Sequence, residues 1–315
     1  MEHNLINRLI SKEISHIFPE PPDKPIVIEL IDRMYSVKDI PEHNWTWHAF
    51  NGFYQLAKEA KRMGKPIKRF ASIGTGSGID AIGAAMAFPD LTDIIVTDVE
   101  KHVVVLAVEN IRKNVSPSIL IKGLVGDVCF PLISDGITVD LVYTNLPNIP
   151  ASEAELIDHG TFYRRMDEIS VNPIIDSYLL SMQQRFLMSL PAALQPGGFA
   201  AVMIGGRFPY ETIEQLASIT RFRISEILSK FKLQTEAINV ASGYAAAETE
   251  TTKFHFYKHK EAKEYINGCG RENALSLQNE LAPWRISATE ALKEVKAGRS
   301  IGHIVHMLKA VPRSH

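Results

Sequence analysis

The stretch Arg69-Phe-Ala-Ser-Ile-Gly-Thr-Gly-Ser-Gly-Ile-Asp80 decides the fold. A short apolar run breaks into three alternating glycines and continues as an alanine-rich amphipathic segment, which predicts a strand, a tight turn and a helix. Gly74, Gly76 and Gly78 let the backbone turn sharply and let a ligand approach the main chain closely. The helix that follows points its first free N–H groups toward whatever lies on the turn. The turn is therefore a candidate binding site.

Three further strands are expected to end on polar side chains. Asp93-Ile-Ile-Val-Thr-Asp98 ends in a carboxylate about twenty residues after the turn, where a ribose diol needs its acceptor. Asp98 is equally placed to cap the next helix, expected over residues 100 to 113. Leu124-Val-Gly-Asp127 places a second carboxylate after a third strand, and Val139-Asp-Leu-Val-Tyr-Thr-Asn-Leu-Pro-Asn-Ile-Pro150 ends a fourth strand on Asn145 and prolines.

Strands and helices alternate over residues 68 to 257, a pattern typical of an α/β fold with a doubly wound, mostly parallel sheet. We expect seven strands. After a long helix over residues 174 to 194 come a fifth strand over 198 to 204, a helix over 210 to 219, and strands near 231 to 240 and 251 to 257. Ligands of such sheets bind beyond the carboxyl ends of the strands, where the four motifs fall.

The flanking segments are expected to be helical. Residues 1 to 67 would form an N-terminal cap, with helices at both ends of a proline-rich break, and residues 258 to 315 would form a C-terminal extension in which Ser287 caps a helix. The first helical stripe consists of Leu5, Ile6, Leu9, Ile10, Ile14 and Ile17. The aromatic segment 39 to 54, with Trp45 and Trp47, either anchors on the core or folds over a ligand. Whether the N-terminal helices form a lid or a homodimer contact stays open.

Composition argues against several classes of protein. The 315 residues carry a formal net charge of −2, which gives no electrostatic footprint for nucleic acid, and no 18-residue apolar run predicts a membrane span. Cys129 and Cys269 form no metal or redox motif, so we expect a reducing cytoplasm and no metal, with Cys129 as buried filler. His303 and His306 are expected to share a helix face as packed or solvated side chains. Arg164, Arg165 and Arg207 are expected in surface ion pairs, with the alternative that they bind a substrate carboxylate.

The spacing Gly-x-Gly-x-Gly resembles that of class I methyltransferases that use S-adenosylmethionine (SAM). A dinucleotide fingerprint would need glycine where Ile79 stands. Asn145-Leu-Pro-Asn-Ile-Pro150 is similar to the Asn-Pro-Pro-Tyr-Ile-Pro motif of amino-methyltransferases. The methyltransferase domain of plant methionine S-methyltransferases looks closer still, in residues 40 to 52, in Met203-Ile-Gly-Gly-Arg207, in Lys253-Phe-His-Phe-Tyr257 and in the tail from 288 to 308.

The resemblance implies a Rossmann-like fold with SAM as cofactor. It implies that Gly74, Gly76 and Gly78 pack against the methionine part of SAM, that Asp98 accepts from the ribose, that Asp127 accepts from the adenine amine, and that Asn145 faces the substrate or the sulfonium. Two departures stand out. Ser72 occupies the position where the family carries an acid for the SAM amine, and Leu146 and Asn148 replace the first proline and the aromatic of the asparagine motif. Tyr163 and Tyr178 are candidates to face the sulfonium, with packing as the alternative.

These motifs lead to one leading hypothesis and three alternatives. The first is methyl transfer from SAM to a small amino-acid-like acceptor, methionine included. The second, motivated by Ser72, is a SAM cyclase that forms azetidine-2-carboxylate and methylthioadenosine. The third is a SAM sensor or scaffold without activity. A nucleic-acid methyltransferase is the fourth, and the near-neutral charge speaks against it.

Overall fold

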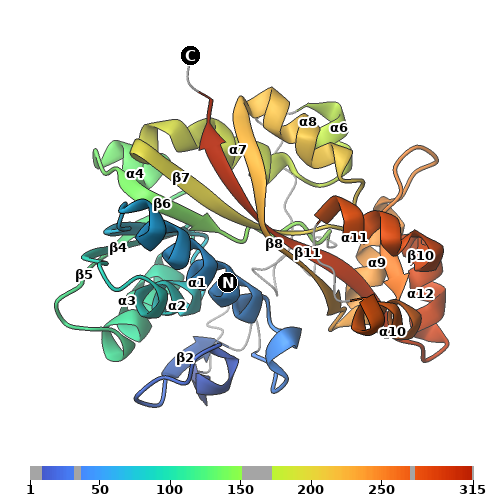
Figure 1. The fold of residues 1–315 in the computed structure, drawn as a ribbon, viewed down its shortest axis with the longest axis horizontal. Helices are drawn as coiled ribbons and strands as arrows, with labels where there is room; N and C mark the ends of the chain where they lie inside the picture. The colour runs from blue at the N-terminus through green and yellow to red at the C-terminus, as the bar shows by residue number, and fades with distance from the viewer. Residues whose placement is uncertain (1–8, 32–36, 151–171, 270–273, 314–315) are drawn as a thin grey trace, which may run out of the picture.

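The chain folds around one large sheet, shown by the computed structural model in Figure 1, which describes residues 9–31, 37–150, 172–269 and 274–313. Within these residues the sheet has nine strands in the order β10-β9-β11-β7-β6-β3-β4-β5, with β8 paired to β11. The strands are β3 (Arg69–Ile73), β4 (Asp93–Asp98), β5 (Leu120–Val125), β6 (Val139–Thr144), β7 (Leu194–Gly205), β8 (Phe222–Leu233), β9 (Phe256–Lys258), β10 (Arg285–Ile286) and β11 (Ile301–Pro312).

The sheet is mostly parallel, as the alternation of elements predicted. Strands β5, β4, β3, β6 and β7 are parallel neighbours, while β11 runs antiparallel between β7 and β8. The two strands beyond the seven expected are β10 and β11. Because β11 pairs with both β7 and β8, the last residues of the chain complete the middle of the sheet.

Helices cover both faces of the sheet. One face packs α1 (Trp45–Met63), α2 (Ile79–Ala87) and α3 (Lys101–Asn114); the other packs α4 (Phe130–Ser134), α6 (Pro173–Ser177), α7 (Ser181–Ser189) and α8 (Glu211–Thr220). Successive strand residues point to opposite faces, so Phe70 joins the α1 face and Ala71 the α7 face. The single helix expected over 174 to 194 is instead α6, α7 and the 3-10 helix η3 (Leu190–Ala193).

The N-terminal cap differs from the expected pair of helices. Residues Leu9–Glu13 and Val27–Ile31 form an antiparallel hairpin, β1–β2, connected through the 3-10 helix η1 (Ser15–Ile17). The hairpin is held by α3, because the Asn110 and Asn114 side chains bond the backbone of β2. That long-range bonding satisfies the strand and overrides the helical spacing of Leu9 and Ile10, which are exposed. Leu5 and Ile6 lie outside the described residues.

The C-terminal extension is partly helical, as expected. It contains α10 (His259–Cys269), α11 (Ala274–Glu280), the 3-10 helix η4 (Ala282–Trp284) and α12 (Ala288–Lys296), and Ser287 caps α12 in a capping box with Glu290. The prediction of an extension separate from the core was wrong for β11. The strand expected over 231 to 240 ends at Leu233, and α9 (Ala237–Ala247) follows it. Within the described residues no helix combines the length and the apolar character that a membrane crossing requires.

Candidate functional site

The strand order reverses between β3 and β6, since β4 and β5 lie on one side of β3 while β6 and β7 lie on the other. Connections that leave two neighbouring parallel strands in opposite directions open a crevice beyond their carboxyl ends, where ligands of open α/β sheets bind. The glycine turn follows β3 and the asparagine motif follows β6. The two motifs predicted from the sequence therefore lie together at the carboxyl ends of β3 and β6, where such a crevice is expected.

The glycine turn adopts the backbone that its sequence requires. Gly74, Gly76 and Gly78 all have positive φ, at 64°, 54° and 82°. A Cβ on Gly78 would lie 2.9 Å from the Ala107 carbonyl oxygen, so this glycine permits the close packing of the turn on α3. A Cβ on Gly76 would have nothing within 4 Å. Gly76 therefore exposes the backbone of the turn, the property needed for a ligand to lie against it.

The Asp98 carboxylate accepts hydrogen bonds from two backbone N–H groups, one of them in the glycine turn. Its Oδ1 accepts from the backbone N–H of Glu100, the residue that precedes α3, at 3.2 Å, and its Oδ2 accepts from the Gly76 N–H at 3.3 Å. Burial raises the pKa of this carboxyl in spite of the backbone donors. Asp98 thus ties the end of β4 to the glycine turn and keeps a carboxylate beside Gly76.

Asp127 follows β5 and is engaged by a side chain from the opposite part of the chain. Its Oδ2 pairs with Nη2 of Arg185 on α7 at 2.7 Å, and the Arg185 guanidinium lies 5.3 Å from the Phe130 ring centre. No motif in the sequence connects Asp127 with Arg185. The ion pair fixes the Asp127 carboxylate beyond the carboxyl end of β5, and the Arg185 charge offsets that of the carboxylate.

The asparagine motif lies beside the glycine turn. A Cβ on Gly74 would lie 3.3 Å from Leu146, and the Gln183 side chain donates to the Leu146 carbonyl at 3.3 Å. The Asn148 carbonyl accepts from the Tyr244 hydroxyl at 2.6 Å. Asn145 is half-buried, and its side chain makes no hydrogen bond with another described residue. The amide of Asn145 is therefore available at the end of β6.

Ser72, which stands where an acid was expected, is a buried residue of β3. In the parallel pair of β3 and β6, Ser72 is the register partner of Tyr143, so the two side chains lie on the same face. Asp80, in the first turn of α2, interacts with the Tyr143 hydroxyl, and its buried Oδ1 has no hydrogen-bond partner among the described residues. Burial raises the pKa of Asp80 to about 7. A carboxyl group that is partly protonated at neutral pH therefore lies buried near the Tyr143 hydroxyl.

Of the two tyrosines proposed to face a sulfonium, the structure describes Tyr178. Tyr163 lies outside the described residues. Tyr178 packs against Phe208 and Phe254, with ring centres 6.4 and 6.0 Å away. Burial raises the pKa of its hydroxyl. These contacts correspond to the packing alternative for Tyr178.

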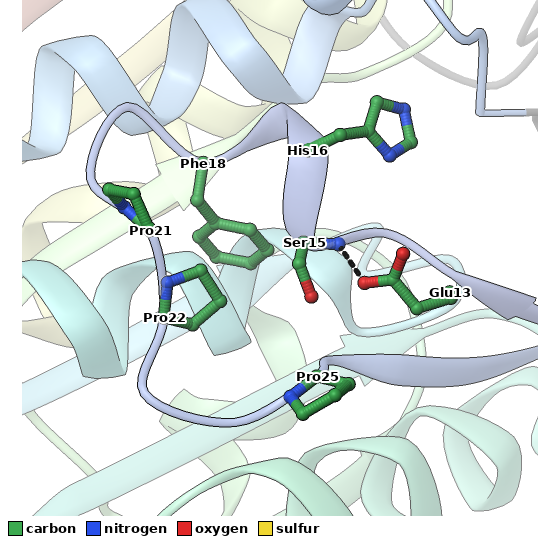
Figure 2. A pocket seen from close by; sticks show the side chains of 7 residues that line it. All are labelled: Glu13, Ser15, His16, Phe18, Pro21, Pro22 and Pro25. Carbon is green, nitrogen blue, oxygen red and sulfur yellow. Dashed lines mark hydrogen bonds between the residues drawn. The ribbon is translucent and has the colours of Figure 1, made fainter.

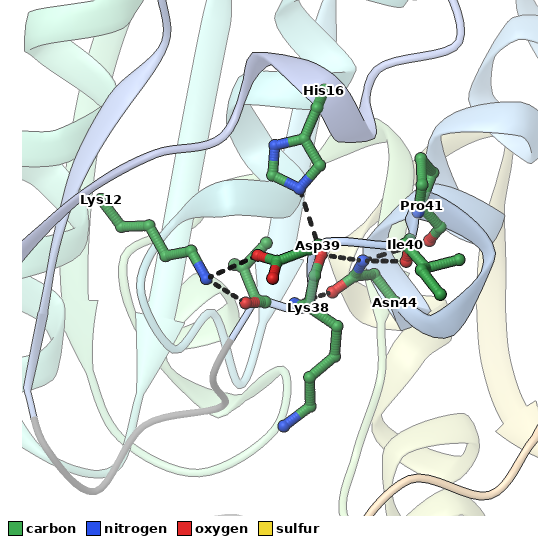
Figure 3. A network of polar contacts seen from close by, with 8 residues as sticks. Lys12, His16, Lys38, Asp39, Ile40, Pro41 and Asn44 are labelled. Atoms are coloured by element: carbon green, nitrogen blue, oxygen red, sulfur yellow. Dashed lines mark hydrogen bonds and ion pairs between the residues drawn. The ribbon is translucent and has the colours of Figure 1, made fainter.

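The segment before α1 is shaped by one buried asparagine. Asn44 accepts from the Lys38 N–H at 2.7 Å and donates to the carbonyls of Lys38, Ile40 and Pro41, closing the turn around the 3-10 helix η2 (Pro41–His43) (Figure 3). In the same figure the hairpin joins this turn, because His16 bonds the Lys38 carbonyl and Lys12 pairs with Asp39. The turn sets the start of α1 and with it the position of Trp45.

The hairpin also forms a surface pocket of about 610 Å³, shown in Figure 2. Its lining consists of Glu13, Ser15, His16, Phe18, Pro21, Pro22 and Pro25. The Ser15 side chain and the Ser15 N–H, which donates to Glu13, lower the pKa of the Glu13 carboxyl. None of the residues predicted to bind a cofactor lines this pocket.

A buried cationic cluster, formed by Arg207, Lys232 and His303, lies at the same edge of the sheet. Arg207 follows β7, Lys232 is near the end of β8, and His303, at the start of β11, is the register partner of Lys232. Arg207 Nη2 lies 3.0 Å from His303 Nε2, and the Arg207 and Lys232 side chains both lie over the Trp45 ring. The expected surface ion pair of Arg207 was wrong, because Arg207 is 1% exposed.

Other residues considered from the sequence are packed side chains. His303 and His306 sit on strand β11 instead of a helix, three residues apart and hence on opposite faces. Both are fully buried, and burial is the largest cause that lowers the pKa of each ring. Cys129 is buried as expected, with its pKa raised to about 12, so its thiol stays protonated. No group of three or more metal-binding side chains is found among the described residues.

The fold of this chain is similar to that of several solved structures, at low sequence identity. A ribosomal protein L11 methylase from Lactobacillus delbrueckii subsp. bulgaricus matches at 20% identity over 62% of this chain and 76% of its own, with a TM-score of 0.38. A putative methyltransferase from Bacillus halodurans matches at 11% identity over 82% of this chain and 99% of its own, with a TM-score of 0.40. A precorrin-6y C5,15-methyltransferase from Geobacter metallireducens matches at 10% identity over 90% of this chain and 94% of its own, with a TM-score of 0.41.

No protein-family model and no curated protein matches the chain. The solved structures are too distant to support a functional inference, because all three identities are at or below 20% and all three TM-scores are below 0.5. The inference of function therefore rests on the residues of this chain, above all on those that line the crevice between β3 and β6.

Proposed function

We propose that this chain is a SAM-dependent methyltransferase that acts on a small amino-acid-like acceptor. One observation carries the proposal: the open glycine turn at Gly76 lies at the reversal of strand order with Asp98 bonded to it. A nucleoside with an amino-acid tail needs these two features side by side. Exposed backbone lets its tail approach closely, and a carboxylate at the next strand end accepts from its ribose.

The remaining residues fit the rest of such a ligand. Asp127, held by Arg185, lies after the next strand, β5, where the adenine amine would find an acceptor. Asn145 lies after β6 on the other side of the turn, toward the acceptor. Thr75 and Thr97 line the same turn with buried hydroxyls that have no hydrogen-bond partner among the described residues. These orphaned groups are the kind of atoms that a polar ligand satisfies.

The chemistry asks little of the protein beyond positioning. SAM supplies an activated methyl group, which leaves sulfur by in-line displacement. Holding donor and acceptor in attacking geometry contributes ~7–11 kcal/mol in favourable cases. A thioether acceptor loses no proton, so an amide such as Asn145 suffices as a site. An amine acceptor would need a proton acceptor, and Asp80, whose pKa burial raises to about 7, is the candidate.

Ser72 also favours a second candidate, a SAM cyclase. In that reaction the SAM amine forms a bond to the side-chain carbon attached to sulfur, the C–S bond breaks with its electron pair going to methylthioadenosine, and the nitrogen releases a proton. The product is azetidine-2-carboxylate. The amine must be unprotonated to attack, and Ser72 does not hold it as an ammonium ion. Asp80, whose pKa burial raises to about 7, is our candidate to accept the proton.

Product analysis separates the candidates. The purified chain is incubated with SAM alone and with SAM plus a panel of amino acids, and the nucleosides are identified by mass spectrometry. S-adenosylhomocysteine that depends on one acceptor supports methyl transfer. Methylthioadenosine from SAM alone, above the rate of a reaction without protein, supports cyclisation. Unchanged SAM in every mixture would refute both.

A matched pair of glycine variants tests the binding site itself. Gly76 and Gly136 both have positive φ, and a Cβ on either would meet no atom within 4 Å, so alanine strains the backbone equally at both positions. We expect Gly76→Ala to weaken S-adenosylhomocysteine binding at least about tenfold, as measured by calorimetry, which corresponds to about 1.4 kcal/mol. Gly136→Ala should bind normally, and equal losses in the two variants would contradict the proposed site.

A further inference from the structure

Two cationic side chains are buried side by side at the edge of the sheet where β7 and β8 end, without an acid between them. Arg207 is 1% exposed and Lys232 is 2% exposed. No carboxylate of the described residues forms an ion pair with either of them. A buried charge is costly unless it is paired and hydrogen-bonded, so this arrangement calls for an anion.

Two nitrogens of the buried Arg207 guanidinium lack hydrogen-bond partners among the described residues. Its Nη2 donates to the Gln234 side chain at 2.7 Å and contacts His303, whereas Nε and Nη1 have no hydrogen-bond partner among the described residues. Gly205 lets the guanidinium lie against the backbone, because a Cβ there would be 2.3 Å from Nη1. A buried guanidinium with unused N–H groups is suited to a ligand oxygen.

The groups around Arg207 and Lys232 do not neutralise their positive charge. Lys232 Nζ donates to the Leu233 carbonyl at 3.2 Å, and the acid in its vicinity, Glu236, pairs with Lys38 at 3.0 Å. Helix α1 begins at Trp45 without an acidic residue in its first turn and without a capping side chain. Its free N–H groups therefore contribute positive potential beside the cluster.

The cluster adjoins the crevice through Tyr244. The Tyr244 ring lies 5.2 Å from the Arg207 guanidinium, and its hydroxyl bonds the Asn148 carbonyl in the asparagine motif. We propose that Arg207, Lys232 and His303 form a binding site for a carboxylate group of a ligand that occupies the crevice. This proposal rests on the proposed function, since it names the group by which an amino-acid-like ligand is recognised.

Aromatic rings surround the Arg207 guanidinium. Trp45, Tyr244 and Phe256 have ring centres 5.2 to 5.9 Å from the guanidinium carbon, an apolar setting that strengthens the attraction between a cation and an anion. Burial and the charge of Arg207 lower the pKa of Lys232 to about 7, so the cluster carries between one and two charges at neutral pH. Two sources present a carboxylate here: the acceptor, or the amino-acid end of the SAM molecule.

Calorimetry on the full chain distinguishes the two sources. The nucleoside arm compares S-adenosylhomocysteine with 5′-methylthioadenosine, which lacks the carboxylate. The acceptor arm compares L-methionine with L-methioninamide while S-adenosylhomocysteine saturates the protein. A third measurement compares thermal unfolding in sodium acetate and in sodium chloride at equal ionic strength. Each is repeated with Lys232→Met, which replaces a buried cation by an apolar side chain of similar length and should fold, and with Arg207→Gln.

We expect Lys232→Met to lower affinity about tenfold or more for the carboxylate ligand of one arm, and to leave its carboxylate-free analogue unchanged. Loss for S-adenosylhomocysteine identifies the nucleoside as the source; loss for methionine identifies the acceptor. Arg223→Gln, at the exposed far end of β8, should match the unmodified protein. The proposal is overturned if Lys232→Met changes neither arm nor the acetate effect. If neither nucleoside binds while acetate still stabilises the protein, the proposed function fails and the carboxylate site stands.

Discussion

The Lys232 ammonium lies 5.7 Å from the centre of the Trp45 ring, and most of the titratable groups near it are positive or neutral. The titratable groups whose charges act on Lys232, or on which Lys232 acts, are Arg207, Lys38, Glu236, His43, His48 and His303. Burial and the nearby Arg207 charge bring its pKa from 10.5 to about 7. The folded protein therefore holds this lysine partly neutral at a pH where the unfolded chain holds it charged.

This difference makes the stability depend on pH in a defined direction. Between pH 7 and 10.5 the unfolded state binds the Lys232 proton and the folded state does not, so the free energy of unfolding rises with pH across this range. Below pH 7 the folded protein bears the full cost of the buried charge. We expect Lys232→Met to be more stable than the unmodified protein at pH 6, by about 1 kcal/mol or more, with the gap closing toward pH 10. Urea unfolding of both proteins from pH 6 to 10 measures it; parallel curves would show that this lysine is not responsible.

Asp80 produces a slope of the opposite sign. Burial raises its pKa from 3.8 to about 7, so the folded protein binds a proton that the unfolded chain has released between these values. Asp80 therefore makes the protein less stable as the pH rises from 4 to 7. Asp80→Asn removes this loss, and we expect the variant to gain about 1 kcal/mol or more over the unmodified protein between pH 4 and pH 7.5. Denaturant unfolding at the two pH values measures the gain, and an unchanged difference would exclude the assignment.

At the scale of elements, one side chain couples the N-terminal hairpin to the glycine turn. Asn110, fully buried on α3, accepts from the Glu29 N–H at 2.8 Å and donates to the carbonyls of Glu29 and Ser77 at 2.8 and 2.9 Å. Asn114, one helical turn later, bonds the backbone of Val27 but does not reach the glycine turn. The two asparagines hold the same hairpin, and Asn110 alone of the pair supports the candidate site.

This pair provides an internally controlled experiment. Asn110→Ala leaves three backbone groups without partners and is expected to cost about 1–3 kcal/mol of stability, with weaker S-adenosylhomocysteine binding because the turn at Ser77 loses its support. Asn114→Ala should loosen the hairpin, at a smaller cost because the site is exposed, and should bind normally. Chemical unfolding and calorimetry give both quantities. Equal affinities of the two variants would mean that the hairpin does not position the turn.

In the molecule as a whole, β11 is an interior strand that connects β7 with β8 and β9. It pairs with β7 and β8 over most of its length, and residues 301 to 308 are all buried. The cationic cluster also depends on it, because β11 brings His303 next to Lys232. The tail is therefore part of the core.

Truncation should show this directly. A chain that ends at Gly298 lacks β11 and leaves the facing edges of β7 and β8 without partners, so we expect it not to unfold cooperatively and to be cleaved rapidly by protease. A chain that ends at Pro312 keeps the whole ladder and should stay folded. Circular dichroism during heating compares the two. Cooperative unfolding of the shorter chain would show that the sheet closes without β11.

Local sequence signals specify the parallel half of the sheet and the residues at its carboxyl ends. The elements from β3 to β6 follow the predicted ranges closely because each is specified locally, by a glycine turn, an apolar run or a strand-end acid. Those motifs also located Gly76, Asp98, Asp127 and Asn145 on one edge, because parallel strands share their carboxyl ends.

Tertiary structure alone decided the rest. A strand buried on both faces, such as β11, has no alternation to distinguish it from a helix, and its place between β7 and β8 depends on pairing across the chain. The hairpin likewise takes its bonds from α3, more than eighty residues away. Arg207, Lys232 and His303 come from three separate segments, and only their burial together, without an ion pair to any carboxylate of the described residues, turns three ordinary side chains into a candidate anion site.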